Sequence, residues 1–305
     1  MKKEIKNKPA SVKAKLMKIS LNEKIDFDSL LLRYFQERFL YRCSISKYSD
    51  KLILKGGLLL ICLNIPQIRA TKDIDFLGEN ISNKPDKIEE IIKSIAELDY
   101  PDGVKFLASS IKSEKIREDA DYEGLRIKIE ATLGKAKKKI QIDIGFGDKV
   151  FPKIIKMNFP SLINENSPII NAYSLESVIS EKFEAMVKLS MVNSRMKDFY
   201  DVYNLLLNFS YSFKILMEAV KETFNRRNTN LMNTPVIFQK EFHLDKTRQQ
   251  QWIAFLNKSK LYNVNQSFSK IMEKITIFLE PIVISIKNKD NIYSTWNNIK
   301  GQWIK

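Results

Sequence analysis

The chain has 305 residues and a formal net charge of +15, with two cysteines and a single histidine. These counts exclude an ordinary Cys/His zinc cluster and argue against a disulfide framework, so any transfer or hydrolytic chemistry must use carboxylates, lysines and metal. No apolar run reaches the ~18 residues of a membrane span, and the basic N-terminus lacks the apolar stretch of a signal peptide. We therefore expect a cytoplasmic protein with no membrane partner. Its positive charge is typical of proteins that bind RNA or DNA, although lysine is abundant along the whole sequence.

Residues 1–48 are predicted to form an N-terminal helical segment. Val12, Leu16 and Ile19 recur at helical spacing, and Asp26 or Asp28 is suited to cap a second helix rich in leucine and aromatic residues. We interpret those aromatic side chains as core packing.

The stretch Leu52–Leu77 carries the strongest signal for chemistry. A short apolar run reaches Gly56 and Gly57, and a second strand-like run carries Asp73 and Asp75 on alternate positions. Side chains two apart on a strand share a face, so the two carboxylates are expected to face one spot that suits Mg²⁺, while the two glycines let a phosphate approach the backbone. A lone Asp-x-Asp is also common at solvated strand edges, and a glycine pair is common in turns.

Residues 49–150 alternate strand and helix patterns, which predicts an α+β core. We expect a helix over 86–98 and strands over 104–107, 113–117, 124–133 and 140–145. On the last strand, Asp143 faces away from its apolar neighbours. It is expected to be either a third metal carboxylate or a salt-bridge partner of Arg126 or Lys128. The basic run 134–139 is interpreted as a hairpin turn, either solvated or in contact with nucleic acid.

Residues 151–170, with three prolines, are predicted to be a surface connector, and 171–305 a C-terminal helical domain that completes the active-site cleft. Two charges fall on the apolar faces of its first two helices, Lys182 and then Asp198. Lys182 either extends to solvent or faces an anion, and Asp198 either faces the same cleft or caps its helix. A long amphipathic helix is expected over 266–286, and Trp296 and Trp303 are expected to dock the tail.

Several of these segments, in this order, resemble the AbiEii/AbiGii toxin family of bacterial nucleotidyltransferases. The resemblance covers roughly residues 8–210 and is carried by the segments 54–57, 69–76, 142–148, 180–186 and 197–203. It implies a polymerase-β-like nucleotidyltransferase core, a mixed sheet with flanking helices, followed by a C-terminal helical region.

The resemblance also assigns roles. Asp73 and Asp75 match the catalytic metal-binding pair, and Asp143 matches a third metal carboxylate. The nucleotide-binding set that it implies comprises Gly56, Gly57, Arg69, Thr71 and Lys182. Lys182 and Asp198 match the catalytic residues of the later motifs. The chain departs from the family pattern at Leu58, where Ser or Thr is usual, and at Lys197, where Arg is usual; the second change keeps the charge.

The implied activity is transfer of a nucleotide from an NTP to RNA, with two Mg²⁺ ions and the tRNA 3′ end as the expected acceptor. Such a protein would be the toxin of a toxin–antitoxin or abortive-infection (phage defence) system, with a cognate antitoxin encoded nearby. Two alternatives stay open at this point. One is nucleotide transfer to protein hydroxyls or to a small molecule, and the other is a non-catalytic module that binds RNA or an antitoxin.

Overall fold

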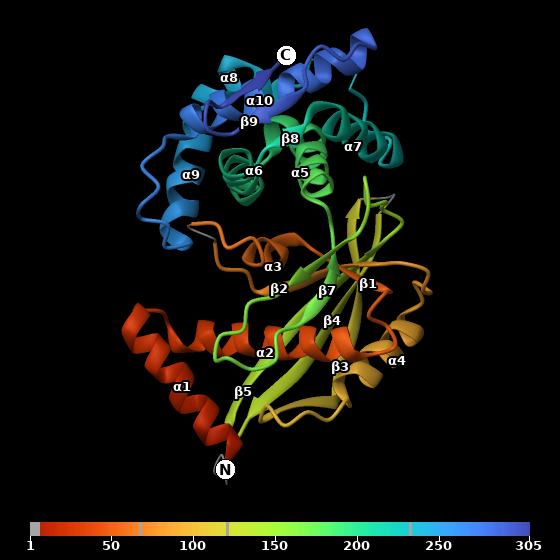
Figure 1. Cartoon of the computed structure of the whole chain (residues 1–305), viewed down its shortest axis with the longest axis vertical. Helices are drawn as coiled ribbons and strands as arrows, with labels where there is room; N and C mark the ends of the chain where they lie inside the picture. The colour runs from red at the N-terminus through yellow and green to blue at the C-terminus, as the bar shows by residue number, and fades with distance from the viewer. Residues whose placement is uncertain (1–6, 67–68, 120–121, 232–233) are drawn as a thin grey trace. The chain divides into compact units, whose positions relative to one another are not determined.

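The computed structural model describes residues 7–66, 69–119, 122–231 and 234–305 (Figure 1). The chain folds into two compact units. The sheet unit comprises the residues up to Asn64, Ala70–Gly147 and Ile155–Ala172. The helical unit comprises Ile65–Arg69, Asp148–Ile154 and Tyr173–Lys305. Within the described residues, no helix is both long enough and apolar enough to span a bilayer.

The sheet unit is built on a seven-stranded mixed sheet in the order β3-β4-β5-β2-β1-β7-β6. The pairs β2–β5 and β1–β7 are parallel, and the other neighbours are antiparallel. A mixed sheet with flanking helices confirms the predicted fold class. The strands are β1 Leu52–Lys55, β2 Asp73–Gly78, β3 Val104–Asp119, β4 Tyr122–Leu133, β5 Ala136–Phe146, β6 Ile155–Asn158 and β7 Ile169–Ala172.

Helices flank this sheet. They are α1 Lys8–Glu23, α2 Phe27–Ile45, α3 Gly56–Ile61 and α4 Pro85–Ala96. Helix α2 packs on β5 and β7, α4 packs on β3, and the two helices contact each other (Figure 1). Asp26, one of the two caps expected from the sequence, accepts a hydrogen bond from the Ser29 amide and begins α2. In β4 and β5 the buried side chains point to one side of the sheet and the polar side chains to the other. In β2, Ile74 and Phe76 point to the buried side, whereas Asp73 and Asp75 point to the polar side.

Strand β3 differs from the sequence-based expectation of two separate strands over 104–107 and 113–117. It is one continuous strand paired with β4, and its register shifts between Leu107 and Lys112. Extra residues at a bulge break the alternation of side chains without ending the strand. That break explains why the sequence pattern looked like two elements.

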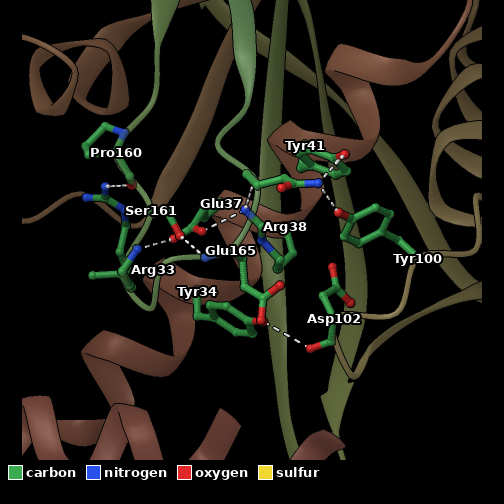
Figure 2. Close-up of polar contacts among 12 residues, drawn as sticks. Arg33, Tyr34, Glu37, Arg38, Tyr41, Tyr100, Asp102, Pro160, Ser161 and Glu165 are labelled. Atoms are coloured by element: carbon green, nitrogen blue, oxygen red, sulfur yellow. Dashed lines mark hydrogen bonds and ion pairs between the residues drawn. The ribbon is translucent and has the colours of Figure 1, made fainter. Parts of the chain in front are cut away.

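The expected surface connector over 151–170 contains sheet instead. Strand β7 pairs in parallel with β1, with Ala172 beside Leu54, and β6 completes that edge. Residues 160–166, between these strands, are held on α2 by buried polar contacts (Figure 2). The prolines at 160 and 168 therefore bracket a packed loop and not a solvated linker.

Figure 2 shows the layer of polar contacts between α2 and this loop. Arg38 and Glu37 are fully buried and joined at 2.7 Å. Arg38 also donates to the carbonyl of Asn166 at 2.8 Å, and Glu37 accepts from the amide of Leu162 at 2.9 Å. Burial raises the pKa of the Glu37 carboxyl, although Arg38 opposes that shift. Buried charges are tolerated when they are paired in this way, so the layer fixes α2 against the loop.

The helical unit is organised around α10, which packs on α6, α7, α8 and α9. Its helices are α5 Leu175–Leu189, α6 Met196–Asn208, α7 Phe213–Arg226, α8 Lys240–Leu244, α9 Lys246–Lys258 and α10 Phe268–Asn288. A small sheet that the sequence did not predict joins β8 Tyr211–Ser212, β9 Thr295–Asn297 and β10 Gln302–Ile304. Helix α10 confirms the long helix expected over 266–286.

The C-terminal tail docks through its aromatic side chains, as predicted. Trp296 and Trp303 are buried, and their ring centroids lie 4.8 and 5.4 Å from that of Phe278 on α10. Their indole nitrogens donate to the carbonyls of Leu206 and Phe278. Aromatic burial with a satisfied N–H explains why this short segment is held in place.

A second feature of the helical unit is Arg227, which lies among three carboxylates. Its guanidinium nitrogens are 2.9 Å from Asp148, 3.1 Å from Glu181 and 3.0 Å from Glu184. Burial alone would lower the pKa of Arg227, but these carboxylates raise it well above its usual range. The side chains of Asp148 and Glu184 are almost fully buried, so their pairing with this cation offsets the cost of burying their charges.

Candidate active site

The acidic residues predicted in the sheet unit lie on two neighbouring strands. In the parallel register of β2 and β5, Asp75 is beside Asp143 and Asp73 is beside Gln141. Asp73, Asp75 and Asp143 are half-buried, whereas the intervening Ile74 is fully buried. The three carboxylates therefore share the polar face of the sheet.

Gly56 allows the closest approach to this carboxylate face. It has φ of +68°, and a Cβ at this position would lie 2.0 Å from Oδ2 of Asp75. Any side chain larger than hydrogen would therefore displace the carboxylate. Gly57 is buried in the same first turn of α3, and Leu58 is fully buried, so the departure from the family pattern at Leu58 adds to the core and offers no hydroxyl to a ligand.

Asp143 is engaged by Arg126 of β4, one of the two arrangements that the sequence left open. Nε and Nη2 of Arg126 donate to its two carboxylate oxygens at 3.0 and 2.8 Å, and Gln141 donates at 3.2 Å. Hydrogen bonding to Asp143 raises the pKa of Arg126 above its usual range, with a contribution from the charge of Asp73. Arg126 therefore lies within the electrostatic field of both Asp143 and Asp73.

Within the part of the chain that the structure describes, no three Asp, Glu, His or Cys side chains are arranged to hold a metal ion. The pairing of Asp143 with Arg126 is consistent with this, because it leaves Asp73 and Asp75 as the candidate ligand pair. Mg²⁺ is commonly bound by one or two carboxylates, with water and substrate phosphates filling the remaining positions. The chemistry of the Asp73 and Asp75 donor set therefore fits Mg²⁺.

In the helical unit, a second group of predicted residues forms a buried ionic network. Nζ of Lys182 on α5 is 2.8 Å from Oδ1 of Asp198 and 2.8 Å from Oδ2 of Asp201, both on α6. Arg69 forms a two-pronged pair with Asp201 at 2.9 and 2.8 Å, and Arg195 pairs with Asp198 at 2.7 Å. These five side chains, with three cations and two carboxylates, carry a net positive charge.

Burial and pairing act in opposite directions on the charges of this network. Burial alone would lower the pKa of Lys182, but Asp198 and Asp201 raise it above its usual value. Burial alone would raise the pKa of Asp198, but Lys182 and Arg195 lower it to about 2. Lys182 and Asp198 are therefore both charged at neutral pH. Asp198 lies in the first turn of α6, but its side chain pairs with Lys182 and Arg195.

The predicted residues thus fall into two groups, one in each unit. The sheet unit holds Gly56, Gly57, Thr71, Asp73, Asp75 and Asp143, and the helical unit holds Arg69, Lys182 and Asp198. Thr71 is half-buried in the short segment before β2 that is neither helix nor strand.

The sequence-based set omitted Asp201, which contacts both Lys182 and Arg69. The signal that was available is its spacing, three residues after Asp198 on the same helix, which places both carboxylates on one face.

The sequence profile of one protein family matches most of the chain. It is described as the nucleotidyl transferase AbiEii toxin of a type IV toxin–antitoxin system, and it matches residues 38–274. No curated protein matches the chain. Two solved structures from Helicobacter pylori are similar to it, one of JHP933 and one described as a candidate nucleotidyltransferase. The first is 12% identical, with 84% of this chain and 94% of that chain covered and a TM-score of 0.48. The second is 13% identical, with 87% and 98% covered and a TM-score of 0.48.

Proposed function

The chain belongs to the AbiEii family of nucleotidyl transferase toxins of type IV toxin–antitoxin systems, and we propose that it transfers a nucleotide from an NTP to an RNA acceptor at Asp73 and Asp75. The observation that carries the proposal is the pair of carboxylates on alternate positions of β2, with Asp75 directly against Gly56. An acidic pair of this kind attracts a hard divalent cation, which relieves the repulsion between the two charges.

Asp73 and Asp75 would hold Mg²⁺, two ions in the full complex, with Asp143 as an outer carboxylate controlled by Arg126. When bound, the metal would activate the attacking hydroxyl and neutralise charge on the pyrophosphate leaving group. The backbone at Gly56 and Gly57 would orient the nucleotide, because a site without side chains admits a phosphate closely.

Lys182, Arg69 and Thr71 are the proposed contacts for the triphosphate, in agreement with the family resemblance. The net positive charge of the Lys182 network supports this role, because preorganised cations stabilise negative charge that develops during transfer. Asp198 is proposed as a positioning residue for Lys182, since it lies 2.8 Å from the ammonium and is almost fully buried. Its carboxylate would fix the lysine side chain in one orientation.

The net charge of +15 supports a polyanionic acceptor, and the family resemblance favours the 3′ end of tRNA. Depletion of usable tRNA would arrest growth, which suits a toxin that acts in abortive infection against phage. Membership of a type IV toxin–antitoxin family implies that the protein has an antitoxin partner.

A transfer assay tests the proposal. The protein is incubated with Mg²⁺, total bacterial tRNA and each α-labelled NTP separately, with Asp73→Asn as the matched variant. Label on tRNA that is absent with Asp73→Asn supports the proposal and identifies the nucleotide. Label on the protein itself, or on a small molecule, would show that this molecule and not RNA is the acceptor. No label on any acceptor, with NTP and Mg²⁺ binding unchanged in Asp73→Asn, would contradict the catalytic role of this pair and favour a binding module.

A further inference from the structure

The polar face of the sheet continues from the acidic pair across β5, β4 and β3. Its lysines are Lys137 and Lys139 on β5, Lys128 on β4, and Lys105 and Lys112 on β3. The alternate side chains of these strands are the buried apolar residues that face α2 and α4. The lysines and the carboxylates of Asp73, Asp75 and Asp143 therefore belong to one surface of the sheet unit.

Only some of the lysines on this surface are paired with its carboxylates. Lys128 pairs with Glu114 at 2.8 Å and Lys137 pairs with Glu130 at 2.5 Å, while Arg126 takes Asp143. Lys105, Lys112 and Lys139 are exposed and form no ion pair with any described residue. Three positive charges on this face are thus left uncompensated.

The arrangement also brings like charges together. Lys112 lies directly opposite Lys128 in the antiparallel register of β3 and β4. Like charges directly opposite each other destabilise a strand pair. Glu114 already neutralises Lys128, and an anion bound at Lys112 would neutralise the second charge, which gives Lys112 a physical use beyond solubility.

The lysines form a row that ends at the acidic residues, as a surface that leads a nucleic-acid strand to them would. On β5, Lys137, Lys139, Gln141 and Asp143 occupy successive positions on one face. At ~3.3 Å per residue, Lys139 lies about 13 Å from Asp143, the length of about four stacked nucleotides. Within 105–114, 126–132 and 137–143, none of the residues on this face is aromatic, so the surface is suited to phosphates and not to base stacking.

We propose that this lysine face, defined by Lys105, Lys112, Lys128, Lys137 and Lys139, binds the phosphate backbone of the acceptor RNA along its single-stranded 3′ end. The inference rests on the proposed function, because it names the surface that leads the acceptor to Asp73 and Asp75. Recognition is by charge, so binding depends strongly on salt and weakly on sequence.

The test is the salt dependence of binding to a fluorescently labelled single-stranded RNA, measured by anisotropy. The variant Lys105→Gln/Lys112→Gln/Lys139→Gln removes three unpaired charges. The matched control, Lys13→Gln/Lys15→Gln/Lys18→Gln, removes three exposed lysines from α1 in the same unit. Each phosphate contact to a single strand contributes about 0.7 to the slope of log K against log salt, so the sheet variant should lose about 2 from that slope. The control should keep the wild-type slope.

Equal losses in both triple variants, or an unchanged slope in the sheet variant, would overturn the proposal. Asp73→Asn separates this result from the proposed function, because it should bind RNA with the wild-type slope and transfer no nucleotide. If the wild type labels RNA while the sheet variant binds RNA with the wild-type slope, the proposed role of the lysine face is wrong and the proposed function stands. If RNA binding depends on the lysine face but no label reaches RNA, the proposed transfer to RNA is wrong and the proposed RNA-binding role of the lysine face stands. A sheet variant with a raised KM for RNA and an unchanged kcat would support the proposal further.

Discussion

Replacing Gly56 by alanine should disable the acidic pair without touching a charged residue. The added Cβ would lie 2.0 Å from Oδ2 of Asp75, whereas ordinary van der Waals contact begins near 3.4 Å. The carboxylate must therefore retreat by more than an ångström, and a misplacement of about 1 Å at a reacting centre can cost about 10²-fold in rate. The positive φ adds a strain of about 1–2 kcal/mol for any residue with a Cβ.

The assay measures two quantities for Gly56→Ala, the affinity for Mn²⁺ by calorimetry and the rate of nucleotide transfer. Both should fall, the rate by about 100-fold. Gly134→Ala is the matched control, because Gly134 has φ of +60° in the same unit but its Cβ would meet only Pro9, at an ordinary 3.5 Å. That variant should show similar backbone strain and keep wild-type metal affinity and rate. A Gly56→Ala protein with unchanged metal affinity and transfer rate would refute the reasoning.

Three further predictions concern charge. Arg126→Gln should tighten Mn²⁺ binding measured by calorimetry, because it removes a cation from the field of Asp143 and its neighbours; weaker or unchanged binding would contradict this. Arg227→Gln should lower the unfolding free energy by about 3–5 kcal/mol, because it removes the cation that pairs with the buried carboxylates of Asp148 and Glu184. Urea unfolding followed by tryptophan fluorescence measures this change, since all three tryptophans lie in the helical unit. The control is Arg226→Gln at an exposed position, whose unfolding free energy should stay within about 0.5 kcal/mol of wild type. Because the pKa of Asp198 is lowered to about 2, its ionised form should contribute about 2 kcal/mol of stability above pH ~4, which is lost as pH falls toward 2. The stability gap between wild type and Asp198→Asn should close over that range, and a constant gap would exclude this linkage.

The acidic face could be predicted from the sequence because it depends on local alternation. Asp73 and Asp75 each flank fully buried Ile74, and the same alternation places Gln141 and Asp143 on one face of β5. A period of two is a property of every strand, so no knowledge of distant contacts is needed.

The position of β7 could not be predicted in the same way. It has only four residues and pairs in parallel with β1, which is more than a hundred residues earlier in the sequence. A strand this short carries little periodic signal, and its place in the sheet depends on distant pairing. The buried pair of Arg38 with Glu37 that holds the preceding loop is equally invisible to spacing, because adjacent charged residues on a helix resemble a solvated face.

The ionic network of the helical unit was partly predictable. Lys182 and Asp198 stood out because each interrupts an apolar helix face, and the structure brings them to 2.8 Å. The pairing of Arg69 with Asp201 spans 132 positions in sequence. No local pattern indicates such a contact, which only the folded unit creates.

The most direct test of the central claim compares the fate of two labels of the same NTP. The protein, Mg²⁺ and tRNA are incubated in parallel with α-labelled and γ-labelled nucleotide, and the RNA is isolated. Transfer of a nucleotide at Asp73 and Asp75 predicts α label on the RNA, no γ label on it, and γ label released in pyrophosphate. Loss of all RNA labelling in Asp75→Asn should accompany that result. The appearance of γ label on the acceptor, or α labelling that persists in Asp75→Asn, would contradict the account.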